Sequence, residues 1–142
     1  MSYYTFYDPA TGRILKNQYV DNPRDLRDRT YIPGLYINSI YYIQDGKPVT
    51  FPGLPIRTAS AKYDWDWNTH TWVFNLAKSD EAGRAVRDRL LVAVDRVNPI
   101  WYDSLTEEQQ AQLQAYRLAL LDVTDQPGWP AQVVWPAKPA WL

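Results

Sequence analysis

Residues 126–142 constrain the fold of this chain more than any other stretch. They hold three of its seven tryptophans and four of its eleven prolines. The prolines rule out a helix and favour an extended polyproline II backbone, while the indole rings offer large apolar surfaces with nothing local to bury them. The sequence therefore predicts an extended Trp/Pro-rich tail that lies on a surface, belonging either to this chain or to a partner.

The last part of this tail is predicted to need a partner. Trp129, Val133 and Val134 can add apolar burial beside Trp135. Residues 138–142 offer only Trp141 and Leu142, because alanines occupy positions 137 and 140. Ordering each residue costs conformational entropy, which a single indole offsets poorly. We therefore expect another protein to supply the surface under residues 138–142.

Composition limits the class of protein. The 142 residues suffice for one domain or two small modules, and the net charge of −1 provides no basic field for nucleic acid. The chain has no cysteine, which excludes disulfides, thiolate zinc sites and a cysteine nucleophile. It shows no apolar run of membrane-spanning length and no charged-then-apolar leader. We expect a soluble, unsecreted protein with no nucleic-acid or membrane partner.

Before residue 76 the pattern is that of β-hairpins. Residues 3–7 and 13–15 flank a Pro- and Gly-containing loop, and residues 36–44 and 47–51 flank Asp45-Gly46, the favoured pair for a type I′ turn. A third hairpin is predicted over 63–67 and 71–74, with Trp65 and Trp67 on one face by alternation. Asn22-Pro23 predicts a short helix with Pro23 at its first position and residues 24–29 as its polar body.

After residue 76 the periodicity is helical. Ser79 is the predicted cap of a first helix that ends at Asn98-Pro99, with the apolar positions Ala82, Val86, Leu90 and Val94. Thr106 begins a capping box before a second helix, with the apolar positions Leu113, Tyr116 and Leu120. The short connection predicts an antiparallel αα-hairpin. The fold class is α+β, with a β-rich module over 1–76, a helical hairpin over 77–125 and the extended tail over 126–142.

The motifs for catalysis and metal binding are incomplete. Asp64-Trp65-Asp66-Trp67-Asn68 has the first spacing of a calcium loop, but Thr69 stands where glycine is needed and Asn75 where glutamate is needed. A glycosidase pair formed by Asp64 and Asp66 lacks a neighbour that would raise a carboxyl pKa. His70, the only histidine, is predicted to be a turn residue. We expect no enzyme activity, no metal and no cofactor.

An ordered set of short motifs from Arg87 onward resembles the phage tail assembly chaperone family. The set runs through 87–91, Asp95, 103–106, 116–120, Asp122 and 135–139. It departs from the family's pattern at 96–97, Leu113 and Leu121. In the first half, the motifs at 41–49, Pro52, Pro55 and 65–73 are similar to the small N-terminal module of many phage tail-fibre-associated proteins.

These resemblances imply a non-enzymatic phage tail or tail-fibre assembly chaperone. It would bind a fibre or tail protein through the helical hairpin and the tail, in the host cytoplasm during assembly, with retention in the virion tail and a homo-oligomer left open. The candidate partner-binding residues are Trp129, Trp135, Pro136, Pro139, Trp141, Tyr116 and Arg117.

Two alternatives remain. The chain could be a permanent structural subunit of the virion tail, fibre or baseplate, since an ordered tail suits that role as well. It could also be a carbohydrate-binding module that reads host glycans with the ligand-facing aromatic residues Trp65, Trp67 and Trp72.

Overall fold

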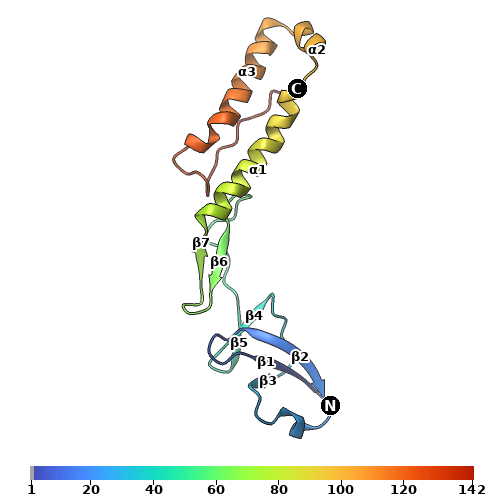
Figure 1. The fold of residues 1–142 in the computed structure, drawn as a ribbon, viewed down its shortest axis with the longest axis vertical. Coiled ribbons are helices and arrows are strands. Elements are labelled where there is room, and N and C mark those ends of the chain that lie inside the picture. The colour runs from blue at the N-terminus through green and yellow to red at the C-terminus, as the bar shows by residue number, and fades with distance from the viewer. Residues whose placement is uncertain (1) are drawn as a thin grey trace. The chain divides into compact units, whose positions relative to one another are not determined.

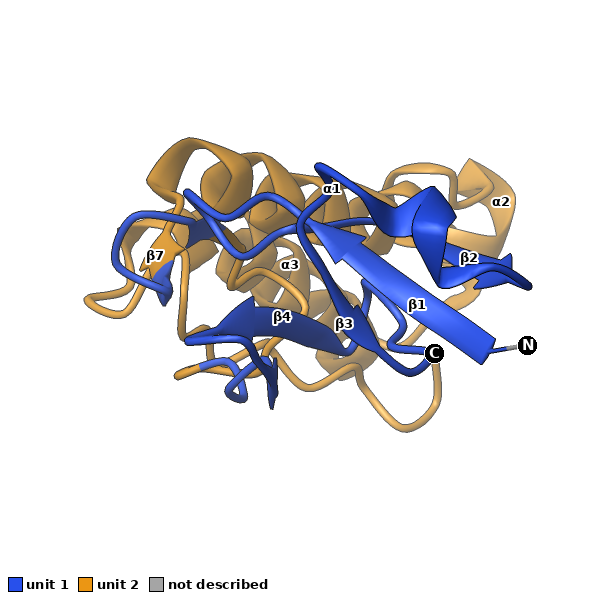
Figure 2. Ribbon diagram, turned by 90° about the horizontal axis from the view of Figure 1, so that it is seen from below, with its two compact units in different colours: residues 1–54, 65–72 blue, residues 55–64, 73–142 orange. Residues whose placement is uncertain are grey.

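The computed structural model describes residues 2–142, and their secondary structure is α+β as predicted (Figure 1). The chain forms two compact units (Figure 2). Unit 1 contains residues 1–54 and 65–72, and unit 2 contains residues 55–64 and 73–142. The boundaries predicted at residues 76 and 125 were drawn where the expected secondary structure changes. The compact units are defined by contacts, and they place the tail in the same unit as the helices.

Unit 1 is built on a three-stranded antiparallel sheet with the strand order β2-β1-β3. Its strands are β1 (Ser2–Tyr7), β2 (Ile14–Val20) and β3 (Tyr31–Pro33). The predicted first hairpin is confirmed, and its second strand continues to Val20. β3 was not predicted because it has only three residues and ends in a proline. Two small apolar clusters form around the sheet, one of Phe6, Val20 and Leu26 and one of Ile14, Ile32 and Ile43.

The second hairpin of unit 1 comprises β4 (Tyr41–Gln44) and β5 (Lys47–Thr50). Asp45 and Gly46 have φ angles of 53° and 71°, as a type I′ turn requires. The first strand is shorter than the predicted 36–44, because the backbone N–H groups of Ile40 and Tyr41 both donate to the Ile37 carbonyl and form a turn there.

The short helix predicted from Pro23 to Arg29 is a 3-10 helix, η1 (Pro23–Leu26). The Asn22 side chain caps it by accepting a hydrogen bond from the Arg24 N–H, as expected. It ends earlier than predicted because the backbone leaves the helical conformation at Arg27, which has a ψ of 139°, and turns at Asp28, which has a φ of 61°.

The third hairpin comprises β6 (Tyr63–Asp66) and β7 (Thr71–Phe74) and contributes residues to both units. Asp66 Oδ1 accepts hydrogen bonds from the backbone of Asn68 and Thr69 in the connecting turn. His70 ends that turn with a φ of 52°, so its prediction as a turn residue is confirmed.

Unit 2 contains α1 (Leu76–Asp95), α2 (Pro99–Ser104), α3 (Glu107–Leu121) and the 3-10 helix η2 (Asp122–Asp125). The prediction that Ser79 caps α1 is wrong: Asn75 is the cap, and it accepts a hydrogen bond from the Lys78 N–H. Ser79 lies inside the helix and is fully buried, and its hydroxyl accepts from the N–H of Lys62. Asparagine and serine are equally good caps, so local preference alone did not separate them.

The connection between the long helices holds a further helix, α2, which was not predicted. Asn98 caps α2 and Pro99 occupies its first turn, so the pair that ends α1 also begins the next helix. The capping box of Thr106 and Gln109 at the start of α3 is confirmed.

The long helices α1 and α3 pack side by side as the predicted hairpin (Figure 1). Their core consists of Leu91, Val94, Leu113, Tyr116 and Leu120, all of them buried. Leu90 packs at the edge of this core.

Candidate functional site

The tail of residues 126–142 lies on the helices of unit 2. Its first anchor is Trp129, whose indole N–H donates to Asp80 Oδ1 over 2.8 Å. Gln126 holds the next turn with two hydrogen bonds of 2.8 Å, one from the Val134 N–H and one to the Val134 carbonyl. The tail therefore has a defined path along the helices.

A glycine in α1 makes room for the Trp129 ring. A Cβ atom at Gly83 would lie 2.5 Å from Trp129 Cη2, closer than side chains tolerate. Gly83 is helical and has no positive φ, so its role here is space and not backbone conformation. The indole can approach the helix backbone at this position because no side chain is present.

The carboxylate that holds Trp129 is itself perturbed. Arg84 donates a hydrogen bond to Asp80 Oδ2 over 2.8 Å, and this bond lowers the pKa of the Asp80 carboxyl, with a further contribution from the Trp129 indole. Both hydrogen bonds favour the charged form. Asp80 therefore accepts from the tail as an anion.

A segment that precedes the helices in sequence holds the tail from its other side. Thr58 Oγ1 donates to the Ala131 carbonyl over 2.7 Å, and the hydroxyl of the buried Ser60 donates to the Pro130 carbonyl. These bonds join positions 73 and 70 residues apart in the sequence. Residues 129–131 of the tail are thus held both by α1 and by residues 58–60.

The end of the tail packs on the helical core. Trp135, Trp141 and Leu142 contact the core of α1 and α3, and the Trp141 N–H donates to Gln112 Oε1 over 2.6 Å. The Trp141 ring lies 6.3 Å from the Trp101 ring of α2, measured between centroids. This differs from the expectation that only a partner covers residues 138–142. The sequence showed that this segment has few apolar residues. It did not show that Gln112 and Trp101 lie beside the Trp141 indole.

A groove of about 570 Å³ runs between α3 and the tail. Its α3 wall consists of Gln112, Ala115, Tyr116 and Ala119, and its other wall is the tail from Pro136 to Trp141. Four of the seven predicted partner-binding residues line it: Tyr116, Pro136, Pro139 and Trp141. Small side chains on α3 keep the groove open.

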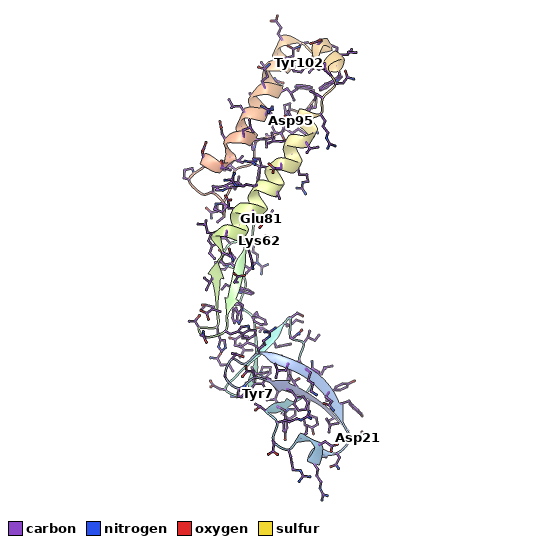
Figure 3. All side chains as sticks on the ribbon, in the orientation of Figure 1. Tyr7, Asp21, Lys62, Glu81, Asp95 and Tyr102 are labelled. Carbon is purple, nitrogen blue, oxygen red and sulfur yellow. The ribbon has the colours of Figure 1, made fainter. Side chains whose placement is uncertain are left out.

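Tyr116 and Arg117 are adjacent in α3 but differ in their surroundings. Tyr116 is only 7% exposed and belongs to the helical core, with its edge in the groove. Arg117 is exposed, and its Nε donates over 2.7 Å to Asp95 Oδ1. Asp95 is the last residue of α1 (Figure 3). Trp129, Trp135 and Arg117 lie outside the groove lining.

The aromatic candidates of unit 1 pack against one another. The rings of Trp65, Trp67 and Trp72 all lie within 6.2 Å of the Phe51 ring, centroid to centroid. The Trp72 N–H donates to the Pro52 carbonyl over 2.7 Å, and His70 Nε2 lies 2.7 Å from the Thr11 carbonyl oxygen. Among residues 2–142, no acceptor reaches the buried N–H of Trp65. These rings form a half-buried aromatic cluster.

The two aspartates of β6 have structural partners. Asp64 forms an ion pair with Lys78 over 2.7 Å and accepts from Asn75, and these hydrogen bonds lower the pKa of its carboxyl. The Asn68 N–H likewise lowers the pKa of Asp66. A glycosidase general acid needs a raised pKa, so this direction disfavours that chemistry. Over residues 2–142, no three His, Asp or Glu side chains gather to form a metal site.

One segment of unit 2 is similar to a known protein family. Residues 80–140 match the family model described as phage tail assembly chaperone protein. The match begins inside α1 at Asp80 and ends two residues before Leu142, so it covers most of α1, all of α2 and α3, and the tail as far as Ala140. It leaves residues 1–79 without a family match, and the resemblance of the first half to tail-fibre-associated modules stays a prediction.

Nothing among the curated proteins or the solved structures matches the chain. In the part of the chain that the structure describes, no helix has the length and apolar character needed to cross a bilayer.

Several residues that shape this surface were missed in the sequence. The indole of Trp129 contacts Gly83 and donates a hydrogen bond to Asp80, and the indole of Trp141 donates one to Gln112. The small side chains of Ala115 and Ala119 leave the groove open. A glycine inside a helix costs stability, so Gly83 carried a signal for a close approach. The alanines carried none, because alanine is an ordinary helix former.

Proposed function

We propose that this chain is a phage tail assembly chaperone that binds a tail or tail-fibre protein through its helices and docked tail and catalyses no reaction. The observation that carries the proposal is the family match over residues 80–140, which coincides with the segment that forms the groove. The proposed partner-binding residues are those predicted from the sequence. Their role is to bind the partner protein while it folds, until it joins the growing phage tail.

The exposed apolar side chains of unit 2 support binding of a protein. Ile100 of α2 and Val134 of the tail are each 81% exposed, and Trp101 is 38% exposed. Together with the small-residue groove, they give this unit apolar surface that water covers in the free chain. Such surface is typical of protein-binding sites.

Blocking the groove tests this proposal. Ala115→Tyr would place a ring in the groove, and Ala93→Tyr would place the same ring on an exposed position of α1 outside it. The partner is first identified by crosslinking the purified chain in lysate of phage-infected cells, followed by mass spectrometry. We expect a tail or fibre protein whose crosslinks Ala115→Tyr reduces and Ala93→Tyr preserves. Equal crosslinking of both folded variants would place the binding surface elsewhere.

A second measurement separates a chaperone from a permanent subunit. We propose that the chain acts in the host cytoplasm during assembly and is then released. Mass spectrometry of purified virions should then find the partner without this chain. Detection of the chain at fixed stoichiometry would instead favour the structural-subunit alternative.

A further inference from the structure

A pocket of about 530 Å³ lies in unit 1, outside the segment that matches the chaperone family. Its volume is in the range of pockets that hold small molecules. Charged and amide side chains share its walls with one indole ring and two aliphatic side chains. The lining residues are Asp8, Arg13, Ile14, Leu15, Asn38 and Trp67.

The backbone of the first hairpin loop fixes two of these residues. The Asp8 N–H donates to the Arg13 carbonyl over 2.9 Å, and the Gly12 N–H donates to the Asp8 carbonyl over 2.7 Å. The loop is also held against β4, because the Ile43 N–H donates to the Gly12 carbonyl over 2.8 Å. Asp8 and Arg13 therefore keep their places before a ligand arrives, which lowers the entropy lost on binding.

The polar side chains of the pocket have groups left for a ligand. Asp8 Oδ1 accepts a hydrogen bond from the Ala10 N–H over 2.9 Å. Among residues 2–142, no donor reaches Asp8 Oδ2, and the side chains of Arg13 and Asn38 form no hydrogen bond or ion pair. A carboxylate accepts, a guanidinium donates and an amide does both. The pocket thus offers both kinds of hydrogen-bonding group.

Trp67 is the aromatic ring of this pocket, and it is half-buried. Its neighbours stand at 74° to 88° to its plane; they are Tyr42, Phe51, Trp65 and His70. By contrast, the rings of Trp65 and His70 are stacked at 15°. In the part of the chain that the structure describes, no ring is stacked on Trp67, so its face can receive a flat apolar surface. Trp65 and Trp72 do not line the pocket.

We propose that this pocket binds a neutral pyranose sugar. Such a ring has C–H groups on its faces and hydroxyl groups around its edge, and each hydroxyl both donates and accepts. One face of the sugar would lie on the Trp67 indole, and its hydroxyls would bond to Asp8, Arg13 and Asn38. Unit 1 would then have a binding function of its own, separate from the protein binding proposed for unit 2.

The charges of the pocket favour a neutral sugar over a charged one. Asp8 repels the carboxylate of an acidic sugar, and Arg13 repels the ammonium group of an amino sugar. A wholly apolar ligand is disfavoured as well, because it would remove both charged groups from water without giving them partners. A ligand with many hydroxyls and no net charge avoids all three costs.

Titration of the isotope-labelled full chain with single sugars tests the proposal. The probes are the methyl glycosides of glucose, galactose, mannose and N-acetylglucosamine, and the readout is the indole N–H signal of Trp67, identified by its loss in Trp67→Leu. We expect at least one probe to shift this signal with a dissociation constant of about 1 to 10 mM. Methyl glucuronide and methyl glucosaminide should bind at least about 10-fold more weakly. Comparing the methyl glycoside with the free sugar distinguishes a unit of a glycan from a free ligand.

Two exposed residues of the pocket have matched controls nearby. Arg13→Gln and Asn38→Ala should each weaken binding of the neutral sugar by about 2- to 10-fold, the effect of a lost hydrogen bond. Lys47→Gln and Ser39→Ala make the same kinds of change at exposed positions of unit 1 outside the pocket, and they should bind as wild type does. Circular dichroism checks that all four variants fold.

A change at Asp8 tests the argument from charge. Asp8→Asn keeps an oxygen that accepts from the Ala10 N–H and removes the negative charge. Methyl glucuronide should then bind about as well as the neutral sugar, because Arg13 remains. The proposal would be overturned if no neutral glycoside shifted the Trp67 signal, if only charged sugars bound wild type, or if Arg13→Gln and Asn38→Ala bound like their controls.

Discussion

At the scale of single residues, the contact between Gly83 and Trp129 decides how closely the tail approaches α1. An added methyl group at Gly83 would meet the indole at 2.5 Å. Overpacking of this kind costs about 1 to 3 kcal/mol, while replacing a helical glycine with alanine gains about 1 kcal/mol. The sign of the net effect therefore depends on whether the ring is present.

We predict that Gly83→Ala lowers the free energy of unfolding by up to about 2 kcal/mol in the wild-type background, where overpacking outweighs the gain in helix propensity. In a Trp129→Ala background the same change should raise it by about 0.5 to 1 kcal/mol, because only the propensity gain remains. Urea denaturation of the four chains measures both effects. The same sign in the two backgrounds would mean that the ring does not occupy this position.

Asp80 gives the tail contact a pH dependence. Its pKa lies below the ordinary value of 3.8 because of Arg84 and Trp129. A carboxyl with a lowered folded-state pKa stabilises the fold above its unfolded pKa and loses this contribution as the pH falls through the folded value. We predict that wild type melts above Asp80→Asn at pH 7 and that the gap closes below about pH 4. A gap independent of pH would show that the charge of Asp80 contributes nothing.

At the scale of elements, the helices were predictable where the cap and the apolar face agreed. Thr106 and Gln109 marked the start of α3, and the spacing of Leu113, Tyr116 and Leu120 marked its buried face. The start of α1 was misplaced because Asn75 and Ser79 are both good caps and only the contact with Lys62 shows that Ser79 is internal. α2 was missed because a proline that ends one helix can also begin another.

Two leucines of α3 test this packing. Leu120 is fully buried in the core, whereas Leu118 is 60% exposed two residues earlier. We predict that Leu120→Ala lowers the free energy of unfolding by about 2 to 5 kcal/mol, the usual cost of emptying a core site. Leu118→Ala should stay within about 0.5 kcal/mol of wild type, as expected of a surface site. Chemical denaturation of both variants provides the comparison, and similar losses would contradict the assigned face.

At the scale of the whole molecule, composition indicated that the tail must lie on a surface but did not identify the surface. That surface belongs to the helices of the same chain. Asp80 accepts from Trp129, Gln112 accepts from Trp141, and Trp135 packs on the core of α1 and α3. None of these partners is near the tail in sequence, so no local pattern joins them. Likewise, the alternation in β6 predicted that Trp65 and Trp67 share one face of the strand. It did not predict that both rings pack against Phe51.

The end of the tail therefore contributes to stability in the isolated chain. Deleting residues 138–142 removes the contacts of Trp141 and Leu142 with the core. For a half-buried indole the gross loss is about 2 to 3 kcal/mol, and the entropy regained by the unordered residues offsets part of it. A net loss of about 1 kcal/mol lowers the melting temperature by about 4 to 8 °C in a unit of this size. Lys138→Ala serves as a control that keeps both side chains. An unchanged melting temperature after the deletion would support the sequence-based expectation that a partner covers this segment.

The hydrogen bonds from Thr58 and Ser60 to the tail have a kinetic consequence. They close loops of 73 and 70 residues around a helical hairpin whose own contacts are far more local. Contacts between distant residues form late in folding, because the entropy of loop closure must be lost first. The helices should therefore assemble before the tail is enclosed, and the tail should be the first part to open, so that amide hydrogens in residues 126–136 exchange with solvent before those of α3.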